Sequence, residues 1–132
     1  IENETNMSIT EIFEKQNEKF FRFLEEKIVL KILKNKKSII SLGGGAFLND
    51  KIRKEIITNH VSFWINCNDR ILLKRIRKNK KRPVANKLTD KELIELFFNR
   101  KKIYTRAKFK IDCEKFTKKE VVKKVIELYE KI

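Results

Sequence analysis

The chain contains little glycine, proline, cysteine or histidine. Its 132 residues include three glycines, one proline, two cysteines and one histidine. No apolar run approaches the ~20 residues that a membrane-spanning helix needs, and residues 1–10 are too polar for a signal peptide. Apolar residues make up 41% of the chain and charged residues 39%. We therefore expect one globular domain with no membrane partner.

The two cysteines stand apart in strand-like surroundings. Cys67 lies in FWINCN and Cys113 in KIDCEK, and the chain has no CxxC pair. This spacing favours buried free thiols over a disulfide or a metal site. Unpaired thiols in turn predict a reducing, cytoplasmic setting.

The net charge of +15 is large for this length and raises the question of a nucleic-acid partner. Of the 33 basic residues, 25 are lysine and 8 are arginine. A sequence-reading interface more often concentrates arginine on one element. We interpret the lysine excess as general composition and expect no nucleic-acid partner, although a basic nucleic-acid-binding module is kept as an alternative.

Hydrophobic spacing and capping residues predict helices that alternate with three short strands. The strands are SIISL, VSFWIN and FKIDC. The predicted helices start at caps on Ser8, Asn17, Asn49 or Asp50, Asp69, Thr89 and Thr117. Residues 79–87, which hold the only proline, are predicted to form a mobile loop. The pattern indicates an α/β fold whose parallel sheet carries helices on both faces.

All three glycines follow the first predicted strand, in SLGGGA. Gly43, Gly44 and Gly45 would let the backbone approach a ligand and turn N–H groups toward negative charge. The run has neither GxxxxGK[ST] nor GxGxxG, so it cannot hold a triphosphate alone. A plain strand-to-helix turn is the alternative. In parallel sheets, ligands bind beyond the carboxyl ends of the strands, which is where these glycines fall.

Arginine is scarce here, so the positions that use it are informative. Arg22 lies between aromatic residues in FFRFLEE, where a guanidinium at a half-buried rim suits a carboxylate or phosphate. Arg82 precedes the proline in the predicted loop, and Arg100 lies in NRKKIY on the following helix. A surface ion pair is the alternative for each, but the commoner lysine would serve that purpose equally well.

SITEIFEKQNEKFFRFLEE, SLGGGA, KRPV and NRKKIY occur in the order and spacing of the shikimate kinases, and the whole chain resembles that family. The resemblance implies that Arg22 and Arg100 bind the shikimate carboxylate, and that Gly43, Gly44 and Gly45 contact the substrate. It also implies that Phe13 and Phe21 line the substrate pocket and that Glu25 orients Arg22.

For the nucleotide, the resemblance implies that Arg82 is a catalytic lid residue on the ATP phosphates and that Arg75 packs near the adenine. Residues 114–117 would form the adenine loop. The domain divides into substrate-binding helices at 8–36, the triglycine turn at 43–45, a lid at about 79–87 and a closing strand and helix at 108–132. No residue of this chain is expected to bind metal.

The family's P-loop and the Asp that binds the shikimate hydroxyls would lie upstream of Ile1. The main ligands of ATP and Mg²⁺ are expected there too. The sequence would then hold the last three strands of a P-loop-kinase sheet of five, as an incomplete part of the enzyme without measurable activity alone. A naturally truncated, non-catalytic relative remains an alternative.

The resemblance thus implies ATP-dependent phosphorylation of the 3-hydroxyl of shikimate in aromatic amino-acid (chorismate) biosynthesis, by a cytoplasmic monomer. The enzyme alternative is another P-loop small-molecule kinase, such as a gluconate kinase. Such an enzyme would not need two carboxylate-directed arginines at positions 22 and 100.

Overall fold

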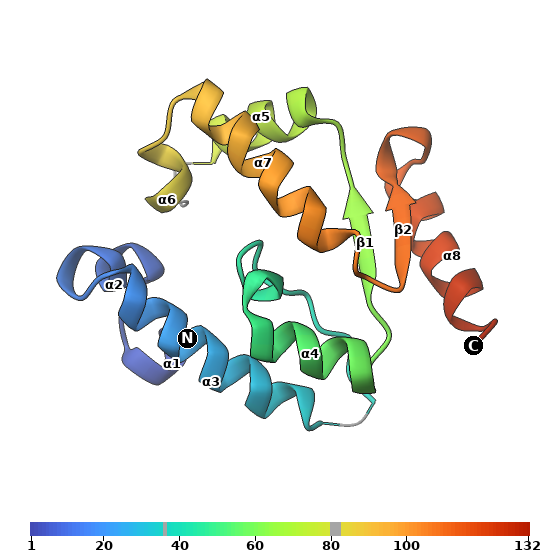
Figure 1. Ribbon diagram of the computed structural model, residues 1–132, viewed down its shortest axis with the longest axis horizontal. Helices are drawn as coiled ribbons and strands as arrows, with labels where there is room; N and C mark the ends of the chain where they lie inside the picture. Colours follow the sequence, from blue (N-terminus) through green and yellow to red (C-terminus); the bar gives the residue numbers. More distant parts are fainter. Residues whose placement is uncertain (36, 80–82) are drawn as a thin grey trace.

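The computed structural model describes residues 1–35, 37–79 and 83–132. Helices predominate in these residues, and two short strands lie side by side (Figure 1). The α-helices are α1 (Glu2–Thr5), α2 (Ile9–Lys15), α3 (Glu18–Leu33), α4 (Asp50–Asn59), α5 (Asp69–Lys78), α6 (Pro83–Asn86), α7 (Asp90–Tyr104) and α8 (Lys118–Tyr129). The strands are β1 (Phe63–Asn66) and β2 (Phe109–Asp112), and the 3₁₀ turns are η1 (Ala46–Leu48) and η2 (Cys113–Lys115).

The two strands are parallel, with Phe63 opposite Phe109 and Asn66 opposite Asp112. Parallel neighbours need a long crossover, which α5, α6 and α7 provide between them. Helix α8 returns along β2 (Figure 1). The predicted α/β fold with a parallel sheet is confirmed.

The strand predicted at SIISL is wrong. Within the described residues the sheet has two strands, and residues 39–42 belong to neither. A β-rich run becomes a strand only when a neighbour accepts its backbone hydrogen bonds, and no described segment pairs with this one. Ile39 is fully exposed, whereas Ile40 and Leu42 pack on the cluster around η1 and α4.

Helix starts follow the predicted caps closely. The Ser8, Thr89 and Thr117 side chains each accept from the backbone N–H three residues on, and the glutamate there bonds back to the cap. Asn17 and Asn49 also cap as predicted. The exception is α5, where Asn68 rather than Asp69 is the cap, because its side chain accepts from the Arg70 N–H at 2.8 Å. Asp69 instead binds Lys101 on α7, with Nζ at 2.9 Å from Oδ2.

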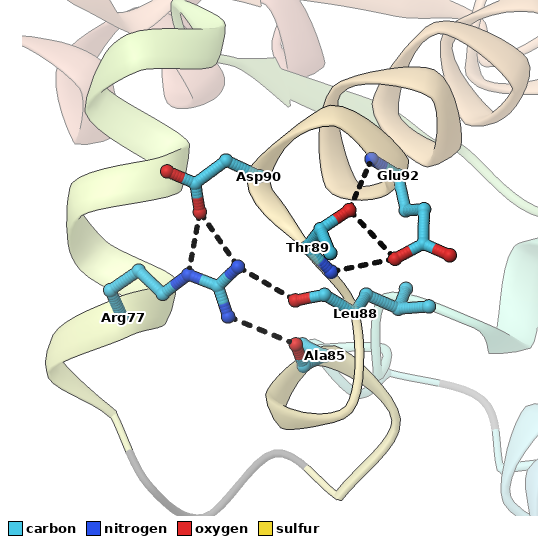
Figure 2. A network of polar contacts seen from close by, with 6 residues as sticks. All are labelled: Arg77, Ala85, Leu88, Thr89, Asp90 and Glu92. Atoms are coloured by element: carbon cyan, nitrogen blue, oxygen red, sulfur yellow. Dashed lines mark hydrogen bonds and ion pairs between the residues drawn. The ribbon is translucent and has the colours of Figure 1, made fainter.

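The prediction of a loop at 79–87 is wrong for its second half, because residues Pro83–Asn86 form α6. Arg77 at the end of α5 stabilises this region, as Figure 2 shows. Its guanidinium donates to the carbonyls of Ala85 at 3.4 Å and Leu88 at 2.7 Å, and it pairs with Asp90 at 2.7 Å. Arg77 thus bonds to one carbonyl of α6 and to two residues just beyond it. Residues 80–82 of the predicted loop lie outside the described part of the chain.

Two apolar clusters form much of the core of the described residues. One lies between α3, η1 and α4 and contains Leu33, Ala46, Phe47, Ile52 and Ile56. The other lies between α5 and α7 and contains Ile76, Leu93 and Phe97. Tyr104, at the end of α7, packs against the first cluster. Helix α7 therefore links the two clusters and carries its last turn to the glycine segment.

The prediction of free thiols is also wrong, because Cys67 and Cys113 form a disulfide with their Cα atoms 5.5 Å apart. The strand register explains this pairing. Asn66 faces Asp112, so the next residue along each strand is a cysteine, and the two meet at the same edge. The inference of a reducing compartment from unpaired thiols therefore loses its basis.

Among the helices of the described residues, none combines the length and the apolar character that crossing a membrane requires.

Candidate active site

The amino-terminal part of α3 places Arg22 beside two carboxylates. The Asn17 side chain caps the helix by accepting from the Phe20 N–H at 2.8 Å. One turn later, Arg22 Nη1 donates to Glu25 Oε2 at 2.7 Å, and Arg22 Nη2 donates to Glu18 Oε1 at 3.0 Å. Glu25 is 7% exposed, so its carboxylate is a rigid partner. The guanidinium is thereby fixed in direction, as expected for a group that must meet a ligand in one orientation.

These contacts also set the charge of Arg22. Burial alone would lower its pKa, but the hydrogen bond and charge of Glu25, followed by those of Glu18, outweigh burial and raise the pKa. Arg22 is therefore a permanent cation.

The glycine segment lies directly against this guanidinium. A Cβ on Gly45 would stand 2.8 Å from Arg22 Cζ, and one on Gly43 would stand 3.3 Å from Glu25 Oε1. None of the three glycines has a positive φ. A side chain at position 45 would therefore displace the Arg22 guanidinium, so glycine serves a close approach here and not a left-handed backbone.

Helix α7 brings Arg100 and Tyr104 to the other side of the same segment. A Cβ on Gly44 would lie 3.5 Å from Arg100 Nη1 and 3.8 Å from the Tyr104 hydroxyl. The two side chains are four residues apart and share one face of the helix. Arg22 and Arg100, 78 positions apart in sequence, therefore flank one glycine turn.

Tyr104 and Arg100 differ in how their polar atoms are satisfied. The Tyr104 hydroxyl donates to the Gly44 carbonyl. Burial raises the pKa of this phenol, and the nearby Arg100 charge offsets the effect only in part. The hydroxyl therefore keeps its proton and acts as the donor. Arg100 Nε is buried and has no hydrogen-bond partner in the described part of the chain, which is rare for a buried donor.

Aromatic rings border the Arg22 side of the site. Phe13 on α2 and Phe21 on α3 lie with ring centroids 4.9 Å apart, and Arg22 Cζ lies 5.2 Å from the Phe21 centroid. The structure thus brings together Phe13, Phe21, Arg22, Glu25, Arg100 and the three glycines. It also adds Tyr104, to which the sequence assigned no role, although its spacing of four from Arg100 was the available signal.

Arg75, predicted to pack near the adenine, is not part of this cluster. Arg75 lies on α5, with Nη1 3.7 Å from the Cys67 sulfur at the end of β1. Arg82 lies outside the described residues.

The described residues do not fit a metal ion, since no group of three His, Cys, Asp or Glu side chains converges among them. No step is therefore assigned to Mg²⁺. The fold and the arginine-flanked turn define the class of the protein, an α/β protein with a site suited to a small anion.

Comparison with known proteins narrows this class to one family. The shikimate kinase family model matches residues 1–130. The chain is 35% identical to shikimate kinase from Thermodesulfovibrio yellowstonii over 133 residues, and spans 77% of that protein. It is 34% identical to shikimate kinase from Bartonella henselae and spans 60% of that relative's length. The chain belongs to the shikimate kinase family.

Solved structures agree with this assignment. The shikimate kinase of Aquifex aeolicus superimposes with a TM-score of 0.84 at 30% identity, with 98% of this chain and 76% of that one covered. The shikimate kinase of Acinetobacter baumannii, solved in complex with shikimate, superimposes with a TM-score of 0.89 over 98% of this chain and 74% of its own. At 22% identity, the second match shows the fold alone.

Proposed function

We propose that this chain supplies the shikimate-binding part of an enzyme that transfers the γ-phosphoryl group of ATP to the 3-hydroxyl of shikimate. One observation carries the proposal, namely that Arg22 and Arg100 flank a glycine turn in which a Gly45 side chain would occupy the place of a guanidinium. Membership of the family points to shikimate as the substrate, and both cations can bind its single carboxylate.

Each residue has a defined task in this proposal. Arg22, held by Glu25, and Arg100, whose Nη1 lies at the glycine turn, bind the carboxylate in one orientation. Gly44 presents its backbone to the substrate, and Phe13 and Phe21 border the ring. Fixing the acid in this way removes rotational and translational freedom before reaction, an effect that can lower the barrier by several kcal/mol.

The reaction forms a bond between the 3-hydroxyl oxygen and the γ-phosphorus, breaks the bond from phosphorus to the oxygen that stays with ADP, and releases the hydroxyl proton. ATP supplies the phosphoryl group when bound. The protein's part in such reactions is mainly positioning and charge stabilisation. The residues of this chain hold the acceptor in place.

The test measures shikimate-dependent ADP formation and shikimate affinity in the complete protein that contains these residues. Arg22→Ala and Arg100→Ala should each weaken shikimate binding at least tenfold, since each removes a charge-assisted hydrogen bond. Arg70→Ala is the matched control, because Arg70 is exposed on α5. Turnover of gluconate but not shikimate would contradict the proposal.

The same variants address the nucleic-acid alternative. Salt-sensitive RNA or DNA binding by a general positive field would fall equally in all three variants, because each loses one charge. Shikimate binding should instead depend on positions 22 and 100 only. Equal loss of shikimate affinity in Arg70→Ala would show that a general positive field, not this site, attracts the acid.

A further inference from the structure

Arg53 on α4 is a buried cation outside the arginine-flanked turn. It is 8% exposed, and Glu25 is the one other charged residue that is buried in the described part of the chain. Removing a guanidinium from water is costly unless its donors are bonded. The chain uses lysine three times as often as arginine. A buried arginine therefore indicates that the fork-shaped set of donors is needed at this position.

The donors of Arg53 bind the backbone directly after the glycine turn. Nη1 donates to the Phe47 carbonyl at 3.1 Å and to the Leu48 carbonyl at 2.8 Å, and Nη2 pairs with Asp50. Both carbonyls belong to η1, a single turn too short to satisfy its own last carbonyls. Arg53 supplies these bonds from the following helix.

The turn η1 and the glycine segment are one hydrogen-bonded unit. The Ala46 N–H donates to the Gly43 carbonyl at 3.0 Å, and the Leu48 N–H donates to the Gly45 carbonyl at 3.1 Å. The Phe47 ring also lies 6.3 Å from the Tyr104 ring, between centroids. A shift of η1 would therefore move the glycines relative to α7.

We propose that Arg53 is a positioning residue for substrate binding. It fixes η1, and through η1 it sets the distance of Gly43–Gly45 from Arg22 and Arg100. This inference rests on the proposed function of the glycine turn. Arg53 acts from the far side of η1, where its side chain lines a surface pocket of about 300 Å³ with Asp50, Lys54, Ile57, Thr58 and Arg106.

The experiment combines truncation with chemical rescue in the complete protein. Arg53→Ala should bind shikimate about tenfold more weakly by calorimetry, since two hydrogen bonds to η1 are lost. Because the pocket opens to solvent beside the missing group, millimolar guanidinium should restore much of the affinity, whereas ammonium at the same concentration should not. Arg106→Ala is the control, since Arg106 is an exposed arginine on the same pocket.

Unchanged shikimate affinity in Arg53→Ala would overturn the proposal, as would equal rescue by ammonium. If Arg53→Ala does not fold, Arg53→Lys replaces it, because an ammonium group keeps the charge but cannot reproduce the fork. We then expect shifted amide resonances at Gly43, Gly44 and Gly45 and several-fold weaker binding. Wild-type resonances and affinity in that variant would overturn the proposal.

The same measurements would give a different result if the proposed function itself were wrong. The wild-type protein would then show no shikimate binding, while the glycine resonances would still shift in Arg53→Lys.

Discussion

The phenol of Tyr104 donates a hydrogen bond to the backbone carbonyl of Gly44, 60 residues earlier in the chain. This contact joins the last turn of α7 to the middle of the glycine turn. The same ring lies 6.3 Å from Phe47 and 6.0 Å from Trp64, between centroids. Tyr104 thus ties the glycine turn both to η1 and to β1, and it fixes the direction of the Gly44 peptide.

Tyr104→Phe should weaken shikimate binding while leaving the fold intact. The substitution keeps the ring contacts and removes one hydrogen bond, which contributes about 1 kcal/mol, or roughly a fivefold change in affinity. Titration calorimetry with shikimate measures the effect. Tyr129→Phe serves as the control because Tyr129 is 62% exposed on α8. Equal losses in both variants would show that the Gly44 bond has no special role.

Gly45→Ala should disrupt the site by displacing Arg22. The added Cβ would lie 2.8 Å from Arg22 Cζ, so the guanidinium would have to move away from its place beside Glu25 and the glycine turn. We expect at least tenfold weaker shikimate binding. Gly44→Ala should displace neighbouring side chains less, because its Cβ would meet them at ordinary distances of 3.5 and 3.8 Å.

A double-mutant cycle separates this mechanism from a general backbone effect. If the clash with the guanidinium is the cause, Gly45→Ala should cost little further affinity once Arg22→Ala has been made. Additive losses would instead place the effect in the backbone.

Local features of this fold were predictable because their causes lie within a few residues. The capping boxes that start α2, α7 and α8 each depend on a Ser or Thr followed by Glu three residues later. The parallel sheet followed from the alternation of strand and helix. The pairing of Arg22 with Glu25 was implied by the family resemblance, and the two residues lie one turn apart on α3, where such pairs can form.

Features that depend on distant partners were not predictable in this way. SIISL has the composition of a strand, but strand formation needs a neighbour to pair with. Cys67 and Cys113 are 46 residues apart and meet only through the register of β1 and β2. The approach of Arg100 to Gly44 likewise requires the α7 crossover. The family resemblance, not periodicity, predicted that these two residues share a site.

The Cys67–Cys113 disulfide should stabilise the sheet. In the chain-entropy model, a loop of this length contributes about 4 kcal/mol by restricting the unfolded chain. Cys67→Ser and Cys113→Ser should therefore lower the melting temperature by similar amounts. The melting temperature of each variant should equal that of the wild-type protein measured in reductant, because none of the three proteins then has the disulfide.

Thiol counting checks the premise of that prediction. Wild-type protein unfolded without reductant should show no free thiol, and unfolded with reductant it should show two. Two free thiols without reductant would contradict the pairing.

The capping box at the start of α7 makes stability depend on pH. Hydrogen bonds from the Thr89 N–H and hydroxyl lower the pKa of Glu92 below its ordinary 4.5, and Figure 2 shows both bonds. The ionised form is therefore the one that the folded state favours. Its stabilising effect is complete above the unfolded pKa and is lost as the pH falls through the lowered folded pKa.

Glu92→Gln should consequently melt at a lower temperature than the wild-type protein at pH 7, because the neutral amide caps without charge. The difference should shrink as the pH falls below about 4 and vanish once Glu92 is protonated. Glu95→Gln, exposed on the same helix, is the matched control for the loss of one carboxylate charge. Melting curves recorded by circular dichroism between pH 2 and 7 measure both differences, and a Glu92→Gln difference that is constant over this range would contradict the assignment.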